Sequence, residues 1–269
     1  MTIEQIIVLA IVQGVSEFLP VSSSGHLILV PVLTGWKDQG LITDVMAHMG
    51  SFLAVLVYFW RDILELVKGG LNLLRGRVTL FGKLAIYIVL ATIPAVAFGL
   101  FVKKTGFIDN IRGAEIVGWN AIIFGLLLYA ADRLGASRKV MEDMKLPPAL
   151  IIGVAQAIAI IPGTSRSGIT MTAARALGYT RPEAARFSFL LGIPAIAGAG
   201  VLVLGEAVSA GETISSAALM TGALTFLTSL AAITFLMALV KRMSFLPFVI
   251  YRLILGVVLL TLVYSGTII

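Results

Sequence analysis

The 269-residue sequence contains no cysteine. Disulfide bonds and thiolate chemistry are therefore excluded. Charged residues are also scarce, at 13% of the chain, whereas soluble domains usually carry about 25%. The N-terminal stretch MTIEQ has no basic cluster, so we expect no cleaved signal peptide. Apolar residues are abundant instead: they make up 59% of the chain, and the mean hydropathy is +1.03.

Several apolar runs are long enough to cross a bilayer, which takes about 20 residues per helix. The sequence therefore predicts an all-α integral membrane protein in a single polytopic domain. Between the first two spans, RDILELVKGGLNLLRGR indicates an amphipathic interfacial helix or a loop. The six predicted spans cover residues 41–60, 81–102, 115–131, 182–204, 214–240 and 243–265.

The distribution of basic residues predicts the orientation. Loops 61–83, 132–147 and 241–242 hold eleven Lys and Arg residues, and the connections on the other side hold four. The positive-inside rule places the first set in the cytoplasm, so both termini face outward. This also explains the pI near 9.7 without nucleic-acid binding. The four outer residues are Lys37, Lys103, Lys104 and Arg112.

Two further segments, 1–36 and 148–178, are apolar but interrupted by Pro, Ser and Gly. Each half is too short to span a bilayer, and irregular backbone is tolerated at that depth only inside protein or beside a water-filled cavity. We therefore expect two re-entrant helical hairpins. A pair of kinked full spans is the alternative.

The two interrupted segments resemble each other. GVSE followed by SSSG in the first matches GVAQ followed by SRSG in the second, and a span carrying SFL comes after each. The predicted orientation makes the hairpins enter from opposite sides, which predicts an inverted repeat with a site near the midplane. Repeat one covers about residues 1–131 and repeat two about 148–269. Chance similarity between Ala-, Gly- and Ser-rich helices is the competing explanation.

Polar residues cluster at both interruptions. Gln13 and Glu17 share one helix face, and Ser23 and His26 lie three apart on the next helix. Hydroxyls suit the start of a helix, where they cap free N–H groups. Helix N-termini and an arginine together favour a phosphate or diphosphate ligand. The candidate binding residues are Gln13, Ser22, Ser24, Gly163, Thr164, Ser165, Ser167 and Thr170, with Arg166 among them.

Structural roles compete with these assignments. Small residues often serve close helix packing, and Glu17 with Arg166 would also form a structural ion pair. We expect a packing role for His48. Asp44 is a candidate supporting or metal-binding carboxylate, and Arg252 is a candidate structural partner or lipid-headgroup contact.

These residues carry a family resemblance. Gln13 to Glu17 running into FLPVSSSGH, and PGTSRSGIT from Pro162 to Thr170, resemble the two signatures of the undecaprenyl-diphosphate phosphatases linked to bacitracin resistance. The agreement continues through GSFLAV, ARFSFLLGIP and SFLPFVIYR, nearly the whole chain. Residue 13 is Gln rather than Glu, a variation that the family pattern admits. Because glutamine is uncharged, this variation bears only on whether residue 13 supplies charge to a metal ion.

The resemblance implies an inner-membrane hydrolase that recycles the cell-wall lipid carrier, with a site open to the periplasm and a divalent cation, Mg²⁺ or Ca²⁺. Matched residue by residue, the functional positions fall on Glu17, Ser23, His26 and Arg166. Our hypothesis makes Ser23 the nucleophile, His26 the general base and acid, and Glu17 a metal ligand. A phosphohistidine at His26 and attack by metal-bound water are the alternatives.

A transporter is the competing functional class, because inverted repeats of broken helices are also a transporter architecture. A polyprenyl-phosphate flippase or an anion carrier fits the same topology. The pairing of Ser23 with His26 beside Glu17 favours hydrolysis, since transport needs no nucleophile. The expected partners are a polyprenyl diphosphate, membrane lipids and a second copy packed through GIPAIAGAG.

Overall fold

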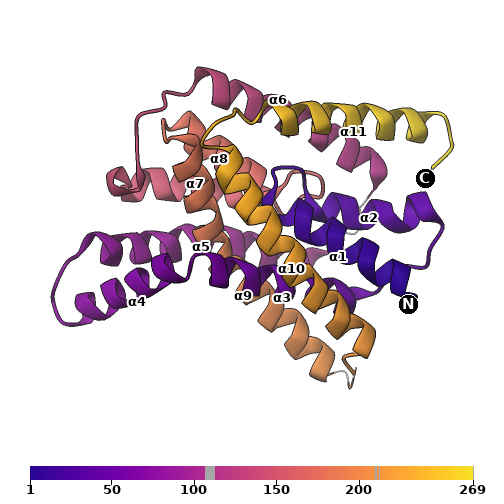
Figure 1. The fold of residues 1–269 in the computed structure, drawn as a ribbon, viewed down its shortest axis with the longest axis horizontal. Helices are drawn as coiled ribbons and strands as arrows, with labels where there is room; N and C mark the ends of the chain where they lie inside the picture. Colours follow the sequence, from indigo (N-terminus) through magenta and orange to yellow (C-terminus); the bar gives the residue numbers. More distant parts are fainter. Residues whose placement is uncertain (107–112, 210, 212, 269) are drawn as a thin grey trace.

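The computed structural model describes residues 1–106, 113–209, 211 and 213–268, and Figure 1 shows their helices. Six of these helices are long and apolar enough to cross a membrane. The predicted all-α fold with six candidate spans is thus confirmed, with ends that differ by a few residues. Arg112, counted in the orientation, lies outside the described residues. The six are α3 (Leu41–Tyr58), α5 (Leu80–Thr105), α6 (Ala114–Leu134), α9 (Arg181–Ser209), α10 (Ser216–Leu239) and α11 (Leu246–Tyr264).

Each interrupted segment consists of two short helices joined by a non-helical break. The first contains α1 (Ile3–Phe18) and α2 (Ser23–Thr34), which pack against each other. The second contains α7 (Leu146–Ile158) and α8 (Arg166–Ala176), also in mutual contact. The sequence therefore located both interruptions correctly, at Leu19–Ser22 and at Ala159–Ser165.

The two breaks end in the same backbone conformation. Ser22 and Ser165 have φ angles of 79° and 73°, and they alone have positive φ among the described residues other than glycine. Each caps the following helix: Ser22 Oγ accepts from the Gly25 N–H at 3.4 Å, and Ser165 Oγ from the Gly168 N–H at 3.1 Å. Such conformations cost roughly 1–3 kcal/mol each and persist only where the surroundings enforce them.

One buried arginine enforces the geometry of both breaks. Arg252 of α11 is 1% exposed and uses all five of its N–H donors on backbone carbonyls. One accepting carbonyl belongs to the first break, at Pro20, and two belong to the second, at Gly163 and Thr164. The other two, at Asn120 and Ala121, belong to α6. Of the two roles considered for Arg252, these contacts correspond to the structural one.

Helix contacts in the two halves follow the same pattern. Helix α1 packs on α10 as α7 packs on α5, and α3 packs on α10 as α9 packs on α5. Helices α6 and α11 pack together, as do α3 and α9 (Figure 1). The segment between the first two spans forms α4 (Trp60–Leu74), packed against α5, so a helix rather than a loop occupies it.

Candidate active site

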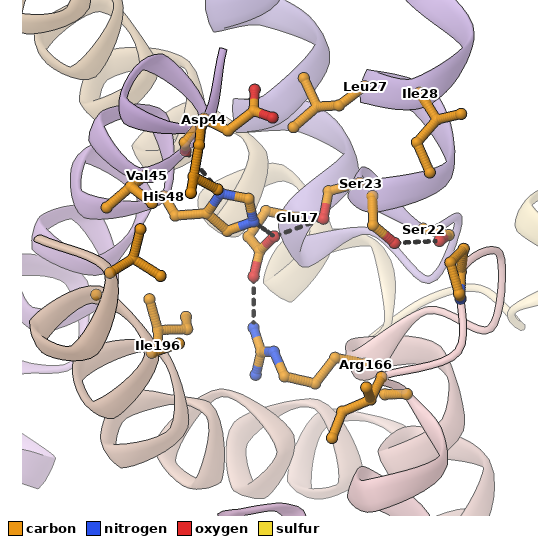
Figure 2. A pocket seen from close by; sticks show the side chains of 18 of the residues that line it. Glu17, Ser22, Ser23, Leu27, Ile28, Asp44, Val45, His48, Arg166 and Ile196 are labelled. Atoms are coloured by element: carbon orange, nitrogen blue, oxygen red, sulfur yellow. Dashed lines mark hydrogen bonds and ion pairs between the residues drawn. The ribbon is translucent and has the colours of Figure 1, made fainter. Parts of the chain in front are cut away.

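The two breaks open onto one cavity of about 490 Å³. Its polar side is formed by the breaks and the helix starts that follow them, and by the first half of α3. Its apolar side is formed largely by α9. Figure 2 shows Glu17, Ser23, His48 and Arg166 converging on it from different elements.

Glu17 is the centre of the polar contacts. Its Oε2 accepts from Ser23 Oγ at 2.6 Å and from Gln13 Nε2 at 3.1 Å. Its Oε1 accepts from Arg166 Nη2 at 3.0 Å. The Glu17 side chain is only 6% exposed. A buried carboxylate with three donors has its charge compensated from both breaks, and the ion pair with Arg166 that the sequence suggested is present.

Arg166 reaches Glu17 through a gap left by a glycine. It is the first residue of α8, and its Nη1 also donates to the Ser188 carbonyl at 3.4 Å. A Cβ at Gly192 of α9 would overlap the guanidinium. Glycine at this position therefore gives the arginine room to cross toward the first break.

His48 lines the cavity beside Glu17 (Figure 2). Its Nδ1 lies 2.8 Å from the Asp44 carbonyl oxygen, and its Nε2 lies 3.7 Å from Glu17 Oε2. From the sequence we expected a packing role for His48. In the structure its side chain lines the cavity. Asp44, four residues earlier on α3, also lines the cavity and accepts from Gln39 Nε2 at 2.8 Å.

His26 is not among the residues that line the cavity. Its Nδ1 lies 2.6 Å from the Ser22 carbonyl oxygen, and its Nε2 lies 2.5 Å from the Tyr251 hydroxyl. The imidazole also stacks on the Tyr251 ring, with the centroids 5.7 Å apart. Both ring nitrogens thus have partners away from Glu17.

The other sequence-predicted binding residues divide into two groups. Ser22, Ser24 and Ser165 line the cavity. The rest are not among the residues that line it. Ser167 donates to the Leu19 carbonyl at 3.0 Å, and Thr170 lies 2.6 Å from Ser188 Oγ. Gln13 and Thr164 are fully buried, and Gly163, at φ 84°, offers its carbonyl to Arg252.

The oxygen atoms of Glu17 and its neighbour Gln13 meet part of what a divalent cation needs as ligands. Among the described residues there is no group of three or more His, Asp or Glu side chains placed to hold a metal ion. The amide oxygen of Gln13 is nevertheless buried without a hydrogen-bond partner, while its Nε2 is bonded to Glu17. Together with the carboxylate this is oxygen chemistry that Mg²⁺ and Ca²⁺ accept, completed by ligands from a bound molecule.

Comparison with known proteins identifies the family. Residues 6–258 match the family described as Bacitracin resistance protein BacA. The chain belongs to this family. A relative from Erythrobacter litoralis named undecaprenyl-diphosphatase is 49% identical, with 97% of this chain and 99% of the relative covered. Relatives of the same name from Jannaschia sp. and Ruegeria pomeroyi are 48% and 47% identical, each covering 98% of this chain and its own full length.

Family membership was predictable from the two signatures. The sequence did not predict how three further residues contribute to the cavity and the two breaks. Gly192 and Arg252 act through contacts with segments distant in sequence, which no local pattern reveals. His48 carried one usable signal: it lies four residues after Asp44, so both face the same side of α3.

Proposed function

We propose that the protein is an undecaprenyl-diphosphatase, a membrane phosphatase that converts undecaprenyl diphosphate and water into undecaprenyl phosphate and inorganic phosphate. One observation carries the proposal: Ser23, Glu17 and Arg166 meet in a single cavity from two separate helix breaks. The names of the relatives favour hydrolysis over the flippase or anion-carrier alternative. The product would return to cell-wall synthesis as its lipid carrier.

We further propose that the two helix–break–helix segments are re-entrant hairpins inserted from opposite leaflets. The matching caps at Ser22 and Ser165 and the paired helix contacts support an inverted repeat of about residues 1–131 and 148–269. In that arrangement the N-termini of α2 and α8 direct free N–H groups and positive dipole ends toward one headgroup.

The terminal phosphate would be bound by Arg166 and the two helix starts. Arginine suits this task because its planar fork meets two phosphate oxygens at once. In the absence of substrate its partner is Glu17, so an incoming phosphate competes with that carboxylate for the guanidinium. Ser22, Ser24 and Ser165 add hydroxyls at the cavity wall. Gln13, Gly163, Thr164, Ser167 and Thr170 would support this surface from behind.

Ser23 is the proposed nucleophile. Its hydroxyl donates to Glu17 Oε2 at 2.6 Å, which directs its proton toward the carboxylate and leaves the oxygen lone pairs for attack. Ser23 Oγ gives its proton to Glu17 and bonds to the terminal phosphorus, while the bond from that phosphorus to the bridging oxygen breaks and undecaprenyl phosphate leaves. Water then attacks the phosphoserine and loses a proton to His26, Ser23 Oγ leaves and takes its proton back from Glu17, and inorganic phosphate is released. Positioning and charge stabilisation are the main demands of such a transfer.

His26 is the proposed general base and acid, as the family resemblance implies. Because Nδ1 faces the Ser22 carbonyl, which only accepts, that nitrogen carries a proton and Nε2 is the working nitrogen. Nε2 contacts Tyr251, so this role requires the ring to exchange that contact for the headgroup or the attacking water.

A divalent cation, Mg²⁺ or Ca²⁺, is the proposed cofactor, and it would neutralise phosphate charge during the transfer. Glu17 would hold it together with phosphate oxygens. An ionised carboxylate offers about four lone-pair sites, so Glu17 can bind a cation and still accept from Ser23.

The apolar wall of the cavity suits a polyprenyl chain. Ile196, Ala199, Gly200 and Val203 of α9 continue from the polar end, so the tail can stay among helices or in lipid while the headgroup enters. We propose a bacterial inner-membrane location with the cavity open to the periplasmic side. Self-association through the α9 stretch GIPAIAGAG remains the proposed route to a homodimer.

The decisive assay measures phosphate release from undecaprenyl diphosphate by the purified protein in detergent. We expect turnover that a chelator abolishes and added Mg²⁺ or Ca²⁺ restores. Arg166→Ala should lower kcat/KM by at least about a hundredfold, because the lost guanidinium stabilises the transferring phosphoryl group. An unaltered protein that releases no phosphate from any polyprenyl diphosphate contradicts the proposal.

A further inference from the structure

We propose that an apolar groove between α3 and α10 binds the distal part of the substrate's polyprenyl tail, which reaches the groove over Met49. The inference rests on the proposed function for the identity of the substrate. It goes beyond the apolar wall of α9, because it assigns a second surface that only a long tail reaches. That surface would make the protein select long polyprenyl chains over short ones.

The groove lies between two packed spans, α3 and α10. Its volume is about 540 Å³, within the range of about 300–1,000 Å³ that is typical of ligand pockets. On each helix the lining residues recur at the spacing of a single helix face. They are Met46, Met49, Gly50 and Leu53 of α3, and Leu219, Gly222, Ala223, Phe226 and Leu227 of α10.

Two buried glycines form the floor of the groove. A Cβ at Gly50 would overlap the carbonyl of Gly222, and a Cβ at Gly222 would lie against the Met46 carbonyl. The two backbones are therefore in direct contact at this point. Because neither glycine has a side chain, the crossing is hollow, and larger neighbours such as Leu53 and Phe226 form the walls.

Met49 connects the groove with the active-site cavity. Its terminal methyl group occupies the space that a side chain at Gly200 of α9 would take. Gly200 lines the cavity, and Met49 lines the groove. One side chain thus separates the two hollows. Methionine is unbranched and flexible, so Met49 is able to move aside for a chain that passes from one hollow to the other.

The groove also continues from the cavity along α3. The cavity is lined by residues of α3 from Leu41 to His48, and the groove is lined from Met46 to Leu53. At 1.5 Å per residue, the groove therefore extends about 7.5 Å beyond His48 along the helix axis. A tail that leaves the cavity past Gly200 enters the groove directly.

The polyprenyl tail is the occupant that these features favour. All nine residues that line the groove are apolar or glycine, so a chain suits it and a charged headgroup does not. A tail whose headgroup is bound in the cavity is held beside the groove at a high effective concentration. The free acyl chains of the bilayer lack this advantage.

The first experiment compares two substrates that differ in tail length, undecaprenyl diphosphate and farnesyl diphosphate, whose tail has only three prenyl units. Ala223→Trp fills the groove from α10, and no described residue of α10 lines the cavity. We expect kcat/KM for the long substrate to fall at least about tenfold, mainly through KM, because uniform binding is lost. Turnover of the short substrate should stay within about twofold. Ala231→Trp, also exposed on α10 but outside the groove, is the matched control and should change neither value.

The second experiment needs neither a variant nor turnover. Unaltered full-length protein in detergent is crosslinked to an undecaprenyl diphosphate analogue that carries a photoreactive diazirine beyond its third prenyl unit. The crosslinks should map to residues 46–53 and 219–227. Excess unlabelled undecaprenyl diphosphate should displace the analogue, whereas excess phospholipid should not.

Three results would overturn the inference. They are a loss in Ala223→Trp that is no greater for the long substrate than for the short one, crosslinks that phospholipid displaces, and a change of oligomeric state in Ala223→Trp. The last would make the groove an interface between two copies of the chain. Crosslinks in the groove without any phosphate release contradict the proposed function alone, and phosphate release with crosslinks elsewhere contradicts this inference alone.

Discussion

At the residue scale, the site depends on space as much as on charge. Arg166 and Glu17 belong to different halves of the chain, and their 3.0 Å contact exists because Gly192 leaves the path between them open. The same helix carries Gly205, whose Cβ position is surrounded by open space. Alanine substitutions at the two glycines can therefore be compared. Both remove a glycine from the helix, but only the one at Gly192 places a methyl group against Arg166.

Gly192→Ala should displace the Arg166 guanidinium and lower kcat/KM at least about tenfold, since a shift near 1 Å can cost about a hundredfold. Phosphate release from undecaprenyl diphosphate measures the effect. Gly205→Ala is the matched control, and we expect turnover within about twofold of the unaltered protein with a slightly more stable helix. Equal activity of the two variants would contradict the steric role of Gly192.

The nucleophile is testable through the phosphoenzyme. Ser23→Ala should lower kcat at least about a thousandfold and abolish trapping of an acid-stable phosphoserine. His26→Gln should lower kcat about a hundredfold or more, as expected for a general base, while still forming some phosphoserine. Tyr251→Phe frees His26 Nε2 and should keep activity within several-fold. An acid-labile phosphohistidine that survives in Ser23→Ala would assign the nucleophile to His26.

Sequence reasoning succeeded where the signal was local. Ser22 and Ser165 begin new helices because hydroxyls cap free N–H groups, and both breaks follow from Pro, Gly and Ser. It failed where a residue acts across the fold. The five carbonyl partners of Arg252 come from three segments, and His48 meets Glu17 only when α3 packs beside α1.

At the scale of elements, the two breaks are held together by hydrogen bonds from Arg252 of α11. Arg252 donates to both, and Ser167 of the second break region donates to the Leu19 carbonyl of the first. The positive φ angles at Ser22 and Ser165 are held against their intrinsic cost by this network. The spacing of Arg166 from Ser23 therefore depends on a residue whose hydrogen bonds go to neither of them.

Arg252→Met should leave five backbone carbonyls without their donor and lower the unfolding free energy by at least about 3 kcal/mol. Arg252→Lys should be intermediate, because an ammonium has three donors for five acceptors. Thermal unfolding in detergent gives the stability and phosphate release gives kcat, which should fall in both variants. Arg133→Met, at an exposed position on α6, is the control, with a loss below about 1 kcal/mol. Normal turnover in folded Arg252→Lys would contradict the coupling of the breaks.

Element boundaries followed the hydropathy pattern closely. The six candidate spans begin and end within a few residues of the predicted limits, because apolar length is a strong local signal. The sequence did not decide whether the segment of α4 is a helix or a loop. The segment is a helix that packs closely against α5, where Gly69 meets Gly82. This contact could not be predicted without knowing how the two helices pack.

At the scale of the whole molecule, the proposed orientation rests on the loops. The pair Lys103 and Lys104 counted against it, and in the structure Lys103 forms an ion pair with Glu206 of α9. Its charge is therefore compensated by a neighbouring helix end. The remaining asymmetry still favours a cytoplasmic location for loop 61–83 and an outer location for loop 35–40.

The absence of cysteine allows a direct test of this orientation, because the unaltered chain has no thiol background. Lys37 and Arg75 are both exposed, and they lie on opposite sides in the proposed topology. In intact spheroplasts, Lys37→Cys should react with a membrane-impermeant maleimide, whereas Arg75→Cys should react only after the membrane is disrupted. Labelling in denaturant controls for expression of each variant. The reverse pattern would place the cavity opening on the cytoplasmic side, and the substrate headgroup would then have to be hydrolysed there.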